Sequence, residues 1–166
     1  MLSFSGKDKT NEEVVEAVLL ENYDRYYRLA YSYVKNEADA ADIVQNGAYK
    51  AIRNSKSLRN AEYAGTWIYR IMLNETFRFC KKNGPIVLPL DEIPVEQGKE
   101  DFYEDIDLKK ALDSLNVKDK AVIELRYFED RQLNEIAEIL GENLSTVKSR
   151  LYRGLGKLRI ELAVDE

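Results

Sequence analysis

Residues 132–158 read QLNEIAEILGENLSTVKSRLYRGLGKL and carry the most informative local pattern of this chain. Apolar residues at helical spacing predict a short helix over 132–140. Gly141 follows it, as expected where a helix ends in a turn with positive φ. Ser145 or Thr146 is then expected to cap a second helix. The stretch therefore predicts a helix-turn-helix, a motif whose second helix enters the major groove of DNA.

The second predicted helix separates an apolar side from a basic side. Its inward residues are Val147, Leu151, Leu155 and Leu158, and its opposite side carries Thr146, Ser149, Arg150, Arg153 and Lys157. A solvated amphipathic helix is the alternative interpretation of such a pattern, but the glycine, turn and cap ahead of it favour DNA binding. Four phosphate contacts would give a salt slope near −3.6, at roughly −0.9 per contact. That slope is small, so we expect a larger complex to supply most of the DNA affinity.

The rest of the chain also predicts helices, and no strand alternation of useful length occurs. Apolar stripes at three- and four-residue steps include Leu19, Tyr23, Tyr26, Ala30 and Tyr33, then Ile43, Val44, Ala48 and Ala51, then Trp67, Ile68, Ile71, Met72 and Phe79. Asn36 is expected to cap the second of these helices. Beyond the middle of the chain, Leu108, Ala111, Leu112 and Leu115 predict a short helix and Ala121, Val122, Leu125 and Phe128 another. The fold class is therefore predicted as all-α.

Charge and proline divide the chain into three parts. All three prolines lie in the stretch 83–105, which holds seven acids and one lysine. Its proline content and lack of helical period predict a linker. Residues 1–82 carry a net charge of +2 and residues 106–166 a net charge of −1, so the acidity of the chain is concentrated between them. We therefore predict two small helical bundles, over 1–82 and 106–166, joined by an acidic linker.

Composition excludes most enzyme classes. The chain of 166 residues has no histidine and one cysteine, which excludes His-based acid/base catalysis, His/Cys zinc sites and an intrachain disulfide. No phosphate-binding glycine loop or nucleophile motif occurs. No apolar run reaches the roughly 18 residues of a membrane span, and no signal peptide is seen at the N-terminus. We expect a cytoplasmic protein without metal, cofactor or catalytic residue.

A second candidate nucleic-acid surface lies in the predicted helix near residues 65–82. Arg70, Asn74, Arg78 and Lys81 fall on one side of it, and aromatic residues including Tyr63 are interleaved with the cations. Aromatics beside cations suit unstacked bases and a single-strand backbone. Trp67 and the tyrosines are also typical core residues, so this pattern alone leaves both interpretations open.

Taken together, the motifs resemble the extracytoplasmic-function (ECF) group of sigma factors, members of the sigma-70 family of bacterial RNA polymerase subunits. The resemblance rests on DIVQ (42–45), TWIYRIMLN (66–74), the acidic linker, EIAEILG (135–141) and TVKSRLYR (146–153), in this order. Within the group, YRLAYSYVKN, GKEDFYEDIDL and RYFED are similar to the sigma-V type. That type responds to cell-wall attack, notably by lysozyme, and is held inactive by a membrane-anchored anti-sigma factor.

The resemblance implies a role for each candidate residue. Asp42 and Gln45 would bind the clamp helices of the polymerase β′ subunit. Tyr63, Trp67, Arg70, Asn74, Arg78 and Lys81 would hold the melted minus-ten element, with Trp67 at its upstream edge. Ser145, Thr146, Lys148, Ser149, Arg150 and Arg153 would read the duplex minus-thirty-five element. The partners implied are core RNA polymerase, promoter DNA as duplex and as melted strand, and the anti-sigma factor, which would keep the protein near the membrane without inserting it.

Two positions depart from the family pattern. The docking motif usually has acids where this chain has Ala41 and Asn46, and the turn usually has an apolar residue where this chain has Glu142. Two other functions stay open on the residues alone. One is a stand-alone helix-turn-helix regulator with an N-terminal sensing domain, and the other is a helical adaptor without a DNA role. The resemblance favours a sigma factor that catalyses no covalent chemistry.

Overall fold

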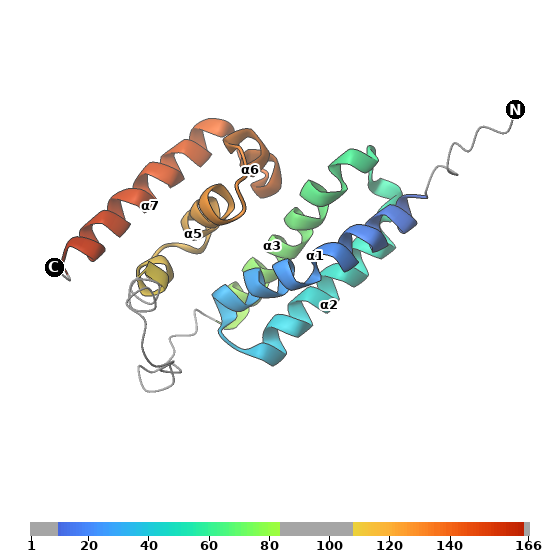
Figure 1. The fold of residues 1–166 in the computed structure, drawn as a ribbon, viewed down its shortest axis with the longest axis horizontal. Helices are drawn as coiled ribbons and strands as arrows, with labels where there is room; N and C mark the ends of the chain where they lie inside the picture. Colours follow the sequence, from blue (N-terminus) through green and yellow to red (C-terminus); the bar gives the residue numbers. More distant parts are fainter. Residues whose placement is uncertain (1–9, 84–107, 165–166) are drawn as a thin grey trace, which may run out of the picture. The chain divides into compact units, whose positions relative to one another are not determined.

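The computed structural model describes residues 10–83 and 108–164, with side chains placed up to residue 159. These residues form two compact helical units, and no strand occurs among them (Figure 1). The predicted all-α class with two bundles is confirmed. The predicted boundaries at 82 and 105 stay a prediction, because residues 84–107, and with them nearly all of the predicted linker, lie outside the described part. None of the described helices combines the length and apolarity needed to cross a membrane.

The N-terminal unit is built from three long helices that lie side by side (Figure 1). They are α1 (Asn11–Val34), α2 (Glu37–Arg53) and α3 (Ala64–Asn83). Thr10 is the N-cap of α1, and its side chain accepts a hydrogen bond from the backbone N–H of Glu13. Asn36 caps α2 in the same way through the N–H of Asp39, at 2.9 Å, which confirms that predicted cap. A sharp reversal joins the two helices, with Lys35 in the left-handed region.

The core of the N-terminal unit is apolar and closely packed. Tyr26 of α1 meets Tyr69 of α3 edge-to-face, with ring centroids 5.3 Å apart. Gly47 lets α2 approach α3, because a Cβ at this position would lie 2.5 Å from the sulfur of Met72. The remaining fully buried side chains include Val15, Val34, Val44, Ile68 and Leu73. The helix α3 is thus held by two neighbours along one side, and its other side faces outward.

Two short 3₁₀ helices connect α2 to α3. They are η1 (Ser55–Ser57) and η2 (Ala61–Tyr63), and Asn60 caps the second. The side chain of Leu58, between them, is buried. The Nδ2 of Asn11, at the start of α1, donates to the carbonyl of Leu58 at 2.8 Å. This bond and the burial of Leu58 fix the connection ahead of α3.

The C-terminal unit contains shorter helices. A helical segment at 108–113 is followed by α5 (Val117–Ile123), the π-helical turn η4 (Glu124–Phe128), α6 (Leu133–Leu140) and α7 (Leu144–Val164). Its buried apolar residues are Ala111, Leu112, Leu115, Ala121, Val122, Ile123, Leu125, Ile136, Ile139, Val147, Leu151 and Leu158. The long α7 packs on both α5 and α6, so these three helices share one core.

Three local predictions need correction. Phe128 was predicted to continue the apolar pattern of its helix, but the π-helical turn changes the register after Ile123 and leaves Phe128 59% exposed. Tyr23 was expected in the apolar stripe of α1 and is exposed. The cap of α7 is Asn143 rather than Ser145 or Thr146, because α7 begins at Leu144 and the Oδ1 of Asn143 accepts from the N–H of Thr146 at 2.8 Å.

Candidate nucleic-acid interface

The outward side of α3 and the 3₁₀ turn just before it carry the six residues predicted to bind the minus-ten element. Five of them lie on α3 at three- and four-residue steps, which places them on one face of the helix: Trp67, Arg70, Asn74, Arg78 and Lys81. Tyr63 ends η2, four residues before Trp67. Arg70, Asn74, Arg78 and Lys81 are exposed, as is Tyr63 at the preceding turn, whereas Trp67 is half-buried. Geometry therefore brings these six residues together in a single stripe. We call it the α3 stripe.

One acid of α3 limits the positive charge of this stripe. Glu75 forms an ion pair with Lys50 of α2, and its Oε1 also lies 3.4 Å from Nη1 of Arg78. Lys50 and Glu75 join two helices, so this pair contributes to the packing of α2 on α3. Arg78 is mostly exposed, and an exposed pair of this kind is worth little in water. Arg78 therefore stays available to a phosphate.

The predicted polymerase-docking residues lie on another surface of the same unit. Asp42 and Gln45 are both exposed on α2, as expected, and Asn46 is exposed beside them. Tyr49 continues the same face one turn further and is 64% exposed. The sequence motif does not include Tyr49, although its seven-residue distance from Asp42 is consistent with the same helical face.

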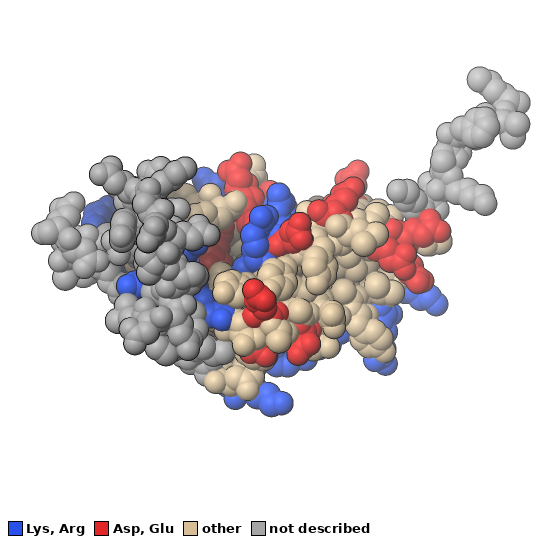
Figure 2. Space-filling view, turned by 60° about the horizontal axis from the view of Figure 1, so that its bottom comes forward, with Lys and Arg blue, Asp and Glu red and all other residues tan. Residues whose placement is uncertain are grey.

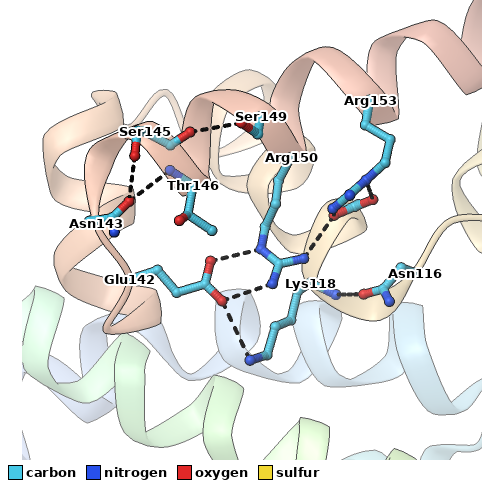
Figure 3. A network of polar contacts seen from close by, with 10 residues as sticks. Asn116, Lys118, Glu142, Asn143, Ser145, Thr146, Ser149, Arg150 and Arg153 are labelled. Atoms are coloured by element: carbon cyan, nitrogen blue, oxygen red, sulfur yellow. Dashed lines mark hydrogen bonds and ion pairs between the residues drawn. The ribbon is translucent and has the colours of Figure 1, made fainter.

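In the C-terminal unit, the start of α7 presents small polar side chains. Asn143 holds this first turn, because its Oδ1 also accepts from the hydroxyl of Ser145, at 2.8 Å (Figure 3). The hydroxyl of Ser149 donates to the carbonyl of Ser145. Ser145, Lys148 and Ser149 are exposed and Thr146 is half-buried. Gly141 ends α6 with φ of 66°, as predicted for the turn.

Arg150 lies differently from its prediction. It was expected on the exposed side of α7, but only 17% of its side chain is accessible. Its Nε and Nη2 donate to the carboxylate of Glu142, at 2.7 and 3.0 Å, and its Nη1 donates to Asp119 at 3.0 Å. Figure 3 shows the guanidinium directed toward Glu142. The physical reason is the nearby pair of acids, which attracts Arg150 toward α5 and the turn.

Arg153 shares one of these acids and remains accessible. Its Nε and Nη2 donate to the two oxygens of Asp119, at 2.8 and 2.9 Å, and 56% of its side chain is exposed. Asp119 itself is buried. Lys118 of α5 adds a longer contact to Glu142, at 3.4 Å. We call Lys118, Asp119, Glu142, Arg150 and Arg153 the α5–α7 network.

The network shifts the pKa values of its members. Burial is the largest influence on Asp119 and raises its pKa, but the hydrogen bonds and charges of Arg153 and Arg150 together outweigh it, so the pKa lies below the ordinary 3.8. The hydrogen bond from Arg150 is the main cause that holds the pKa of Glu142 below 4.5. The same bond raises the pKa of Arg150. All three groups are therefore charged near neutral pH.

Several residues at this site, among them Lys118, were not predicted as members. Asp119 lies 31 positions before Arg150 in the chain, and no local pattern links the two. Glu142 was noted only as a departure from an apolar turn residue, and its partners now explain its charge. Tyr152 is 69% exposed on α7 between the predicted DNA-binding residues. An aromatic residue at a solvent-facing position of the predicted helix was the available signal.

Cations and acids are interspersed on the surface rather than segregated. On the face shown in Figure 2, Lys and Arg side chains lie next to Asp and Glu side chains over the described residues. The candidate positive surfaces are therefore local, on the α3 stripe and along α7. This distribution accounts for candidate DNA surfaces in a chain with a net charge of −5.

Two protein-family models match the two units. The model described as Sigma-70 region 2 matches residues 18–85, and the model described as Sigma-70, region 4 matches residues 111–159. The first match contains Asp42, Gln45 and the α3 stripe. The second contains the α5–α7 network and the helix-turn-helix.

Similar curated proteins extend this likeness over nearly the whole chain. RNA polymerase sigma factor SigV of Bacillus subtilis (strain 168) is 43% identical over 162 residues, which cover 96% of this chain and 98% of that protein. ECF RNA polymerase sigma factor SigW of the same organism is 31% identical, with 84% of this chain and 83% of that protein covered. ECF RNA polymerase sigma factor SigE of Mycolicibacterium smegmatis is 34% identical and covers 89% of this chain, but only 61% of that longer protein.

Two solved structures have a similar fold. The first is the sigma factor RpoE of Bartonella quintana in complex with the anti-sigma factor NepR, with 25% identity and a TM-score of 0.71, covering 91% of this chain and 98% of that one. The second is CnrH in complex with the cytosolic domain of CnrY. Its identity is 18% and its TM-score 0.69, with 95% of this chain and all of that one covered, which is a likeness of fold.

Proposed function

This chain belongs to the extracytoplasmic-function group of the sigma-70 family of RNA polymerase sigma factors, and from that premise we propose how its surfaces divide the work of transcription initiation. A sigma factor is an initiation subunit and not an enzyme. We assign polymerase docking to Asp42 and Gln45, melted minus-ten DNA to the α3 stripe, and duplex minus-thirty-five DNA to the exposed residues of α7. One observation carries the proposal: each unit has a helix with a polar, solvent-facing side, and the opposite side of that helix packs in the core of the same unit.

The α3 stripe has the chemistry of a single-strand surface. Tyr63 and half-buried Trp67 offer flat apolar faces on which bases stack, and stacking contributes about 1–3 kcal/mol per base. Arg70, Arg78 and Lys81 supply charge for the strand backbone, and Asn74 can form paired hydrogen bonds with a base edge. Promoter melting then follows from differential affinity, because a surface that binds the open strand better than the duplex shifts the equilibrium toward opening.

The exposed residues of α7 have the chemistry of a duplex surface. Ser145, Lys148, Ser149 and Arg153 are accessible and lie on the helix that follows the turn of a helix-turn-helix. Lysine and arginine neutralise phosphates, and serine hydroxyls bind either phosphate oxygens or base edges. Thr146, which is half-buried, and Arg150, whose guanidinium faces Glu142 and Asp119, are nearer the protein interior. We propose that these two residues hold the DNA-contacting residues of α7 in place.

We further propose that the protein acts in a cell-envelope stress response, with lysozyme as a candidate inducer, and that a membrane-anchored anti-sigma factor holds it at the cytoplasmic side of the membrane. The 43% identity to SigV and the resemblance of its motifs to the sigma-V type support this assignment. The two solved relatives, each bound to another protein, support an inhibitor that binds these helical units. Affinity capture of the protein from cells before and after lysozyme treatment tests this assignment. The inhibitor should be recovered with the protein before treatment and lost after it.

The main experiment is transcription of fragmented genomic DNA by purified core polymerase, with and without the protein, followed by sequencing of RNA 5′ ends. New start sites that share two upstream elements are expected only when core and protein are both present. A stand-alone regulator would instead bind duplex DNA without core and add no start sites. An adaptor would do neither. In the same assay, Asp42→Ala should lower transcription from all of the new start sites together.

A further inference from the structure

Asp119 connects two arginines of α7 to α5. Both of its carboxylate oxygens accept from Arg153, and Oδ1 also accepts from Arg150. The residue is 3% exposed, so its charge is removed from water and compensated by these two side chains. Such a carboxylate restricts the guanidinium groups that it binds, because a two-bond pair fixes both direction and rotation.

The two arginines are used differently in this arrangement. All three guanidinium nitrogens of Arg150 donate to carboxylates, two to Glu142 and one to Asp119. Arg153 uses only Nε and Nη2, and its Nη1 bonds to none of the residues that the structure describes. The guanidinium of Arg150 therefore bonds within the protein, whereas Arg153 is mostly exposed and its Nη1 can donate to a ligand.

We propose that Asp119 is a positioning residue for DNA recognition: it fixes the guanidinium of Arg153 so that Nη1 is offered to the duplex in one orientation. The inference rests on the proposed function, since it assumes that α7 reads DNA. Arg150 and Glu142 hold the shared carboxylate and the turn in place. An arginine that is already oriented loses less side-chain freedom when it binds a phosphate or a base, which favours the correct site over others.

A simpler role for Asp119 predicts the opposite result. The network contains three cations and two acids, so its formal charge is +1. If Asp119 only neutralised charge, its removal would leave α7 more positive and strengthen binding to any DNA. If Asp119 orients Arg153, its removal weakens binding to the preferred DNA sequence in particular. The two roles therefore differ in the sign of the effect.

The test compares Asp119→Asn with Glu138→Gln, an exposed acid of α6 that loses the same charge. Holoenzymes of core polymerase with each full chain are titrated with a duplex selected from a random pool by the wild-type holoenzyme, and with a scrambled duplex. The ratio of the two affinities should fall about fivefold for Asp119→Asn and stay at the wild-type value for Glu138→Gln. A ratio for Asp119→Asn equal to or above that of Glu138→Gln overturns the proposal.

A second variant avoids the buried position. Arg153→Lys keeps the charge on an exposed side chain, but an ammonium group cannot form the planar pair of parallel bonds that Arg153 makes with Asp119. The ratio of affinities for the selected and scrambled duplexes should fall for this variant as it does for Asp119→Asn. An unchanged ratio would overturn the orienting role. Asp119→Asn in the Arg153→Lys background should then add little, whereas full addition of the two effects would contradict a shared mechanism.

A measurement without DNA separates this inference from the proposed function. In the full chain labelled at arginine, the Nε–H of Arg153 should exchange with water more slowly than that of Arg159, which is also exposed on α7. Asp119→Asn should remove the difference. Equal exchange of Arg153 and Arg159 in the wild-type chain would overturn the orienting role. Failure to select any duplex would instead refute the DNA-binding function, with the exchange result unaffected.

Discussion

The side chain of Ile123 occupies the space that a side chain on Gly154 would need. A Cβ at Gly154 would lie 2.5 Å from the Cδ1 and 3.4 Å from the Cγ1 of Ile123, which is itself buried. Two residues further along α7, a Cβ on Gly156 would meet nothing within 4 Å. The close contact between α5 and α7 thus depends on one glycine and not on the other.

Substitutions at these two glycines should have opposite effects on stability. Gly154→Leu should lower the free energy of unfolding of the C-terminal unit by about 1–3 kcal/mol, because Ile123 must move within a packed core. Gly156→Ala should raise it by about 0.5–1 kcal/mol, since alanine favours helix. Urea unfolding followed by circular dichroism measures both. The fluorescence of Trp67, the single tryptophan, reports on the N-terminal unit and should not change.

Loss of Arg150 should affect stability, in contrast to loss of Lys148. Arg150→Ala leaves Glu142 and Asp119 without three of their bonds and should destabilise the C-terminal unit by about 1–3 kcal/mol. It should also weaken duplex binding while association with core polymerase stays intact. Lys148→Ala, at an exposed position, should change stability by less than about 0.5 kcal/mol and lower the salt slope of DNA binding by about one. Equal stability of the two variants would contradict the supporting role of Arg150.

Acid should destabilise the C-terminal unit through the same network. The pKa values of Asp119 and Glu142 are lower in the folded chain than their ordinary 3.8 and 4.5, so folding favours the ionised forms. Their contribution is complete above the ordinary values and is lost as the pH falls through the lower folded values. Between pH 6 and pH 3, the urea midpoint should fall less for Asp119→Asn/Glu142→Gln than for Glu138→Gln. Parallel pH profiles would exclude this origin of the acid sensitivity.

Docking on core polymerase should depend on Asp42. Asp42→Ala should weaken binding to core roughly tenfold, as expected for truncation of an interface contact. Glu16→Ala removes an exposed acid from α1 and is the matched control, with no expected change. Titration of labelled protein with core polymerase, monitored by fluorescence anisotropy, measures both. Equal affinities would place the docking surface elsewhere on the unit.

Asn74 should act in promoter opening more than in duplex capture. Asn74→Ala removes an exposed amide from the α3 stripe, and open-complex formation should fall more than closed-complex binding because the amide is proposed to read an unpaired base. Fluorescence of 2-aminopurine in the minus-ten element measures opening, and filter binding at low temperature measures capture. Asn83→Ala, an exposed amide at the end of the same helix, should change neither. An equal loss in both assays for Asn74→Ala would show that its role is different.

Local patterns were sufficient to predict the helices and most outward faces. The α3 stripe was predictable because helix geometry alone places residues at three- and four-residue steps on one side. The cap at Asn36 was predictable because one good capping residue precedes that helix. At the start of α7, Asn143, Ser145 and Thr146 are all good caps, and the pattern could not choose among them.

Long-range electrostatics were not predictable from the same patterns. Arg150 has helical spacing suited to an exposed basic side, yet Asp119 from another helix and Glu142 from the turn draw it inward. Phe128 fits the apolar period of its helix, but one π-helical turn changes which side it occupies. In both cases the deciding contact or backbone change lies outside the periodicity that the sequence displays.

The two units bury separate sets of apolar residues, α1 to α3 in one and α5 to α7 in the other. An exchange of residues 108–164 for the corresponding segment of another family member would consequently leave the interior of the N-terminal unit untouched. Under the proposed division of roles, promoter choice at the upstream element would then be a transferable property, which recombination or protein engineering could replace without redesigning the half proposed to open DNA.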